Sequence, residues 1–170
     1  MKAFTKRVYD PSSFLTDAAG FLKNLPKIAQ ALYSGKVEGS LREKVMLAVT
    51  AVNDCRYCNF VHSNLARILD VPEEQIQRIR NHSLDPDLDA EGMFAIEFAR
   101  HFAQTQKHPD QEMVDRLIGT YGEEKARELI LWMEVIFMAN LSGNTFDSFL
   151  ARFHGEKTPS GHLPFEALFA

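Results

Sequence analysis

The sequence predicts an all-α fold, a bundle of helices. It contains few runs in which β-branched and polar residues alternate, the pattern that half-buried strands show. Its nine glycines fall mostly where a helix would end, and Ser, Asp or Pro precedes several apolar segments where a helix would begin. Because 170 residues suffice for one hydrophobic core and no linker or low-complexity tract divides them, we expect a single domain over residues 1–170.

The N-terminal part of the chain is expected to form three helices. Proline is favoured in the first turn of a helix, which predicts one helix over residues 11–22 and a second over 26–33. Ser40 and Glu43 have the spacing of a capping box, so a third, apolar helix is predicted over 40–53.

Two further helices follow before the middle of the chain. Asp54 is expected to cap a helix over residues 55–69, because Asp at this position accepts hydrogen bonds from free N–H groups of the first turn. Pro72, followed by two acidic residues, predicts another helix over 72–81. The segment 83–87 is expected to be a loop.

The second half of the chain continues the helical pattern. A long helix is predicted over residues 89–106, and two more over 111–121 and 123–141. The segment 140–144, Asn-Leu-Ser-Gly-Asn, is expected to break or bend the chain before a last helix over 145–154. Asn140, Asn144 and Asp147 are expected in capping and turn roles, with a polar rim to the site of the two cysteines as the alternative.

Composition excludes several classes of function. The net charge is −4 and no basic run exists, so nucleic-acid binding is not expected. The N-terminus lacks the apolar run of a secretory signal, and the longest apolar stretches are shorter than the ~20 residues that span a bilayer. We therefore expect a cytoplasmic protein with no membrane segment, ending in a polar tail over residues 155–170. No Gly-rich phosphate loop is present, and no cofactor is expected.

The most informative motif is Cys55-Arg-Tyr-Cys58-Asn-Phe-Val-His62, which holds both cysteines of the chain. On a helix these three positions fall on one face, so two sulfurs and an imidazole can share a site. A C-x-x-C pair can oxidise to an internal disulfide, and His62 can accept a thiol proton or stabilise a thiolate, which is the reactive form. The helix that precedes the motif makes Glu43 a candidate fourth member. Tyr57 can either hydrogen-bond at this site or cover it.

Two cysteines at this spacing can also be inert core residues or ligands of a metal ion. Free cysteines are often inert core residues. A structural zinc site needs four ligands, but the chain has no second C-x-x-C pair and no closely spaced pair of histidines to complete one. A redox-sensing or metal-binding helical protein that uses the same Cys/His cluster stays as the alternative to an enzyme.

These residues resemble the AhpD-like alkylhydroperoxidase family of the carboxymuconolactone decarboxylase superfamily. The similarity rests on Glu43 and on the spacing of Cys55, Cys58 and His62, within residues 41–69. It implies an AhpD-like helical bundle and the thiol-dependent reduction of hydroperoxides or disulfides. In this family the second cysteine, here Cys58, is oxidised by peroxide and the first, Cys55, resolves it as a disulfide. The resemblance places His62 and Glu43 in a proton relay.

The resemblance also implies partners. Family members use a hydroperoxide or small disulfide as substrate and a protein or small thiol as electron donor. A lipoylated protein or a peroxiredoxin is such a donor or client in the best-characterised branch. That branch has a histidine directly before the second cysteine, where this chain has Tyr57.

An oligomer is expected from both the resemblance and the composition. Relatives assemble as intertwined trimers or hexamers, which implies a homotrimer or homohexamer here. Thirteen Phe, six Met and one Trp are also a large apolar content for a chain of this length. The segment Leu129–Leu141 is apolar around most of its circumference, which predicts a helix buried on two sides, one of them against a partner.

Overall fold

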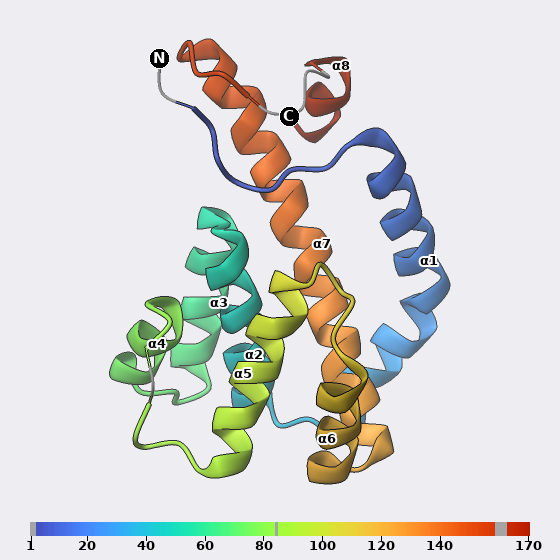
Figure 1. Cartoon of the computed structure of the whole chain (residues 1–170), viewed down its shortest axis with the longest axis vertical. Helices are drawn as coiled ribbons and strands as arrows, with labels where there is room; N and C mark the ends of the chain where they lie inside the picture. The colour runs from blue at the N-terminus through green and yellow to red at the C-terminus, as the bar shows by residue number, and fades with distance from the viewer. Residues whose placement is uncertain (1–2, 84, 159–162) are drawn as a thin grey trace.

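The computed structural model describes residues 3–83, 85–158 and 163–170. Within these ranges all regular structure is helical apart from one isolated bridge between Ala3 and Lys157, which confirms the all-α prediction (Figure 1). The elements are α1 (Pro11–Ser34), α2 (Gly39–Asn53), α3 (Arg56–Ile68), α4 (Glu73–Arg80), α5 (Ala90–Gln104), α6 (Gln111–Tyr121), α7 (Glu123–Phe153), α8 (Leu163–Glu166) and the 3₁₀ turn η1 (Ala167–Phe169). The predicted bounds of α3 to α6 are confirmed to within two residues at each end.

The two helices predicted over 11–22 and 26–33 are a single helix, α1, so this prediction is wrong. Pro26 lies inside α1, where it removes one backbone hydrogen bond. The helix continues because Phe14, on one side of Pro26, and Ile28, on the other, both pack against the same core. Tertiary packing therefore outweighs the local helix-breaking preference of one proline.

Helix α2 lies at the centre of the bundle and packs against α3, α4, α5 and α7. It begins after Glu38, and no side chain caps it, so the capping box predicted from Ser40 and Glu43 is wrong. The reason is that the Glu43 side chain is buried and points to other partners. Two turns of α2, from Val45 to Thr50, are buried, which places this helix inside the core.

Helix α7 is continuous over 31 residues and runs the length of the molecule (Figure 1). The break or bend predicted over 140–144 is absent, because the Asn side chains there bond to neighbouring helices instead of capping this one. By length and composition α7 is apolar enough to cross a membrane, which the sequence prediction of shorter apolar segments did not anticipate. Half of its most apolar window is buried inside the protein, as in a core helix, so this is weak evidence for a membrane span.

The C-terminal segment packs on the bundle, which the prediction of a polar tail did not anticipate. Glu166 is fully buried and accepts hydrogen bonds from Ser148 and Arg152 of α7. The rings of Phe165 and Phe169 make edge contacts with Phe14 of α1. Residues 159–162 of the predicted tail, and Leu84 of the predicted loop over 83–87, lie outside the described ranges.

Residues 3–10, which we call the N-terminal strap, cross α7 before α1 begins (Figure 1). The backbone N–H of Tyr9 donates to Thr145 Oγ1 of α7 at 3.0 Å, and that of Phe4 donates to the carbonyl of Lys157 at 3.0 Å. Arg7 donates to the carbonyl of Ala103 at the end of α5. The strap is thus fixed at both ends and in its middle.

Candidate active site

The junction of α2 and α3 places the C-x-x-C motif. Asp54 adopts the left-handed conformation (φ 54°) and ends α2, so the prediction that it caps the next helix is wrong. Asp is one of the few residues besides Gly that adopt this conformation readily. Cys55 takes the capping position of α3, and its Sγ accepts a hydrogen bond from the backbone N–H of Cys58 at 3.3 Å.

The environment of Cys55 favours its thiolate. A hydrogen bond from the Cys58 thiol lowers the pKa of Cys55 most, and backbone N–H groups of Cys58 and Tyr57 and the charge of Lys6 lower it further. Burial acts in the opposite direction, and the net pKa of Cys55 is about 7. A cysteine at the N-terminus of a helix is the expected place for such a shift.

The environment of Cys58 favours its thiol. Its hydrogen bond to Cys55, its burial and the negative charge of Cys55 all raise the pKa of Cys58 well above the usual cysteine value, and a hydrogen bond with Asn140 opposes them only in part. Both sulfurs are free of a disulfide and almost inaccessible to solvent, with Cys55 1% and Cys58 9% exposed. As the pH rises through about 7, the pair therefore gains one negative charge, and that charge is located on Cys55.

Glu43 and His62 are brought together as predicted. His62 Nδ1 lies 2.6 Å from Glu43 Oε2, and Arg42 Nε donates to Glu43 Oε1 at 3.1 Å. Arg42 in turn lies over the ring of Trp132, 5.2 Å from its centroid. Glu43 is thus a buried carboxylate with two fixed partners, and it orients the imidazole so that Nε2 is its free nitrogen. His62 lies one helical turn after Cys58, with no direct hydrogen bond to either cysteine in the described part of the chain.

Two asparagines of α7 form hydrogen bonds with the end of α2, directly before the motif. Asn140 Nδ2 donates to Thr50 Oγ1 at 3.1 Å, and Asn53 Nδ2 donates to Asn140 Oδ1 at 3.3 Å. Asn144 Nδ2 donates to the carbonyl of Asn53 at 2.7 Å, just ahead of Cys55. Asn140 and Asn144 are fully buried, so the capping and turn roles expected of them are wrong. Their amides pair with buried polar groups that would otherwise be unsatisfied, and they fix the chain where the motif begins.

Gly143 on α7 makes room for the reactive sulfur. A Cβ atom at this position would lie 2.8 Å from Cys55 Sγ and 3.3 Å from Tyr57 Cδ2. Real Cβ atoms do not approach other heavy atoms this closely, so only glycine lets α7 approach the sulfur to this distance. The Gly143 position therefore helps to bury Cys55.

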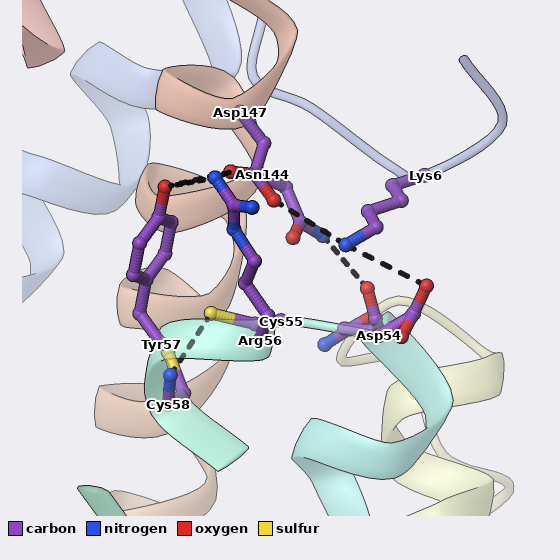
Figure 2. A network of polar contacts seen from close by, with 9 residues as sticks. Lys6, Asp54, Cys55, Arg56, Tyr57, Cys58, Asn144 and Asp147 are labelled. Atoms are coloured by element: carbon purple, nitrogen blue, oxygen red, sulfur yellow. Dashed lines mark hydrogen bonds and ion pairs between the residues drawn. The ribbon is translucent and has the colours of Figure 1, made fainter. Parts of the chain in front are cut away.

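A charged cluster covers the motif on the side of the N-terminal strap (Figure 2). Asp147 Oδ1 accepts from Tyr57 Oη at 2.8 Å and pairs with Arg56 at 2.7 Å. Lys6 Nζ lies 3.3 Å from Asp147 Oδ2 and 3.6 Å from Asp54 Oδ2. Tyr57 thus hydrogen-bonds in this cluster and also lies against the same part of α7 as Cys55, so both roles considered for it apply.

The structure therefore assembles all four predicted residues into two pairs, Cys55 with Cys58 and Glu43 with His62. Two residues at the site were not identified from the sequence as part of it, namely Lys6 and Gly143. No signal in the sequence links Lys6 to the motif, since the contact depends on the path of the strap. Asp147 and the nearby asparagines were noted, but local rules for helix caps favoured the wrong role. Within the described ranges no three His, Cys, Asp or Glu side chains converge on a metal position.

Residues 19–101 match the family model described as the carboxymuconolactone decarboxylase family. This range includes α2 and α3 with all four predicted residues. A comparison with curated proteins found no match. A comparison with solved structures also found none.

Proposed function

Because this chain belongs, through residues 19–101, to the carboxymuconolactone decarboxylase family, we propose that it is a thiol-dependent oxidoreductase that reduces hydroperoxides with Cys55 and Cys58. The family includes decarboxylases and alkylhydroperoxidases. The observation that supports hydroperoxide reduction is the cysteine pair itself. The Cys55 sulfur lies at the N-terminus of α3, and the Cys58 thiol donates a hydrogen bond to it. A pair of this kind supplies a thiolate and a second thiol in one buried site.

The proposed reaction has two steps at sulfur. The Cys55 thiolate attacks one peroxide oxygen, which forms Cys55 sulfenic acid and releases the other oxygen as an alkoxide that takes up a proton. Cys58 then attacks the sulfenic sulfur, and the leaving hydroxide departs as water. The products are an alcohol, water and the Cys55–Cys58 disulfide, and an external dithiol must supply two electrons to restore the starting pair.

Glu43 and His62 are proposed to move the protons. Cys58 starts as a thiol with a raised pKa, so its attack needs a general base. His62 lies one turn away on the same helix, and its bond to Glu43 holds the ring and stabilises the imidazolium that forms. The same imidazolium can then protonate the departing hydroxide.

This order of roles is the reverse of the one that the family resemblance implies, in which Cys58 meets the peroxide. The pKa values favour the reverse order because the thiolate is the nucleophile and Cys55 carries the charge. The two orders predict different behaviour for the Cys55→Ser and Cys58→Ser variants.

The function itself is tested by oxidation of the wild-type protein. One equivalent of hydrogen peroxide or of an alkyl hydroperoxide is expected to be consumed per chain, and intact mass should fall by two hydrogens without a covalent dimer. Both thiols should then resist iodoacetamide until a dithiol is added. Full labelling of both cysteines after peroxide treatment would exclude the proposed function.

The partners and compartment are proposed on the same basis. The reaction needs no dissociable cofactor, and the electron donor would be a protein or small thiol, with a lipoylated protein or a peroxiredoxin as the implied classes. A cytoplasmic location would keep the pair reduced between turnovers.

We also propose a homotrimer or homohexamer in which an exposed apolar face of α1 contacts a neighbouring subunit. In the segment Leu129–Leu141, expected to face a partner with one side, one face is buried within the chain, whereas Leu131, Val135 and Met138 are only partly buried. On α1, Leu15, Leu22, Leu25 and Leu32 are between 43% and 67% exposed and follow one another at intervals of seven, three and seven residues. Light scattering is expected to give a mass three or six times the 19.3 kDa of one chain. A mass of one chain at micromolar concentration would rule the oligomer out.

A further inference from the structure

The N-terminal strap brings a positive charge to the dithiol. Lys6 Nζ lies between two carboxylates, those of Asp54 and Asp147, at 3.6 and 3.3 Å (Figure 2). Asp54 directly precedes Cys55 in the chain, and Asp147 lies one turn of α7 beyond Gly143, whose position contacts the Cys55 sulfur. Lys6 thus lies at the side of the site where the negative charge of a Cys55 thiolate would be added.

The position of Lys6 is fixed by its neighbours in the strap and not by the motif. Its side chain is 21% exposed, and the strap is anchored by Arg7 at the end of α5 and by Tyr9 on α7. A surface lysine normally moves freely and is screened by water. Here the anchors hold the ammonium group beside a buried sulfur, where a charge has a larger effect than in solvent.

We propose that Lys6 is a positioning residue for this chemistry: it balances Asp54 and Asp147 so that Cys55 can hold its negative charge. The inference rests on the proposed thiol function of Cys55. Without Lys6, the carboxylates of Asp54 and Asp147 would keep only Arg56 as a cation in this cluster, and the added negative charge near the motif would disfavour ionisation of Cys55. With Lys6 in place the cluster of two carboxylates and two cations has no net charge. It therefore does not disfavour ionisation of the Cys55 thiol.

In the described part of the chain, six charged or titratable groups take part in this balance around Cys55. They come from the end of α2, from α3, from α7 and from the strap, and comprise Asp54, Arg56, Tyr57, Cys58, Asp147 and Lys6. Lys6 contributes directly to the lowered pKa of Cys55, in the direction expected of a nearby cation.

The test compares two substitutions with opposite charge effects. The rate of iodoacetamide labelling at Cys55 is measured against pH, with the labelled residue identified by mass spectrometry. Lys6→Met is expected to move the midpoint of the profile upward by about 0.5–1 pH unit and to slow labelling at pH 7 by about two- to fivefold. Asp147→Asn, which leaves an oxygen acceptor for Tyr57, is expected to move the midpoint downward. The double variant should return toward the wild-type midpoint.

Three controls distinguish an effect of the Lys6 charge from an effect of the substitution on the folding of the strap. Lys6→Arg should restore the wild-type midpoint, and Lys23→Met, at an exposed position of α1, should not change it although it removes the same charge. A thermal melt of each variant reports whether the strap remains folded. The inference is overturned if Lys6→Met leaves the midpoint unchanged, or if Lys6→Met and Asp147→Asn move it in the same direction. The proposed function fails separately, in the wild type, if Cys55 shows no midpoint near pH 7 or forms no disulfide.

Discussion

Replacing Cys55 with serine is expected to slow iodoacetamide labelling of this protein at pH 7 by about tenfold or more, while Cys58→Ser retains a fast-reacting thiol. The reason is that Cys55, with a pKa of about 7, is half ionised at that pH, whereas its hydrogen bond to Cys55 and its burial keep Cys58 protonated. In Cys58→Ser the serine hydroxyl can donate to Cys55 in place of the thiol, and the backbone N–H of residue 58 and the charge of Lys6 remain, so Cys55 stays acidic. Labelling of that variant should rise with pH through about 7 and then level off, because the thiolate is the reacting form.

The same variants decide which cysteine meets the peroxide. Neither can form the disulfide, so a sulfenic acid should persist and be trapped by dimedone. We expect the adduct on Cys55 in Cys58→Ser and little adduct in Cys55→Ser. If Cys55→Ser instead labels rapidly and accumulates the adduct on Cys58, the order implied by the family resemblance is correct and the one proposed from the pKa values is wrong.

His62→Ala is expected to slow disulfide formation after a peroxide pulse by about 10²–10⁴-fold, the usual contribution of a general base. The variant leaves Cys58 without the base that its raised pKa requires. The sulfenic acid of Cys55 should therefore persist long enough to be trapped, whereas in the wild type the disulfide forms first. Quenched-flow sampling with mass spectrometry measures both species over time.

Two further variants make this result specific. Glu43→Gln keeps an acceptor for His62 Nδ1 but removes the carboxylate charge, and it should slow the same step by a smaller factor. His108→Ala, at an exposed position far along the chain from the motif, is the matched control and should form the disulfide at the wild-type rate. A wild-type rate in His62→Ala would remove the Glu43–His62 pair from the mechanism.

Much of the helical framework followed from local sequence signals. Turn and cap residues located α3 to α6 closely because these signals act within one or two helical turns. The same signals wrongly predicted a helix boundary at Pro26, which lies inside α1, and a break at residues 140–144, which lie inside α7. In both cases the packing of a continuous apolar face against the core outweighs the preference of a few residues, which no local rule measures.

The sequence by itself determined the chemistry available at the site, because the spacing of Cys55, Cys58 and His62 places them on one helix and Glu43 on the helix before it. Only the tertiary structure decided which of the two cysteines is the more acidic and therefore carries the thiolate. The acidity of Cys55 depends on its capping position, on the approach of α7 at Gly143 and on the charge of Lys6. These contacts join segments far apart in the chain, and electrostatic and packing energies depend on distance in space, which sequence spacing does not provide.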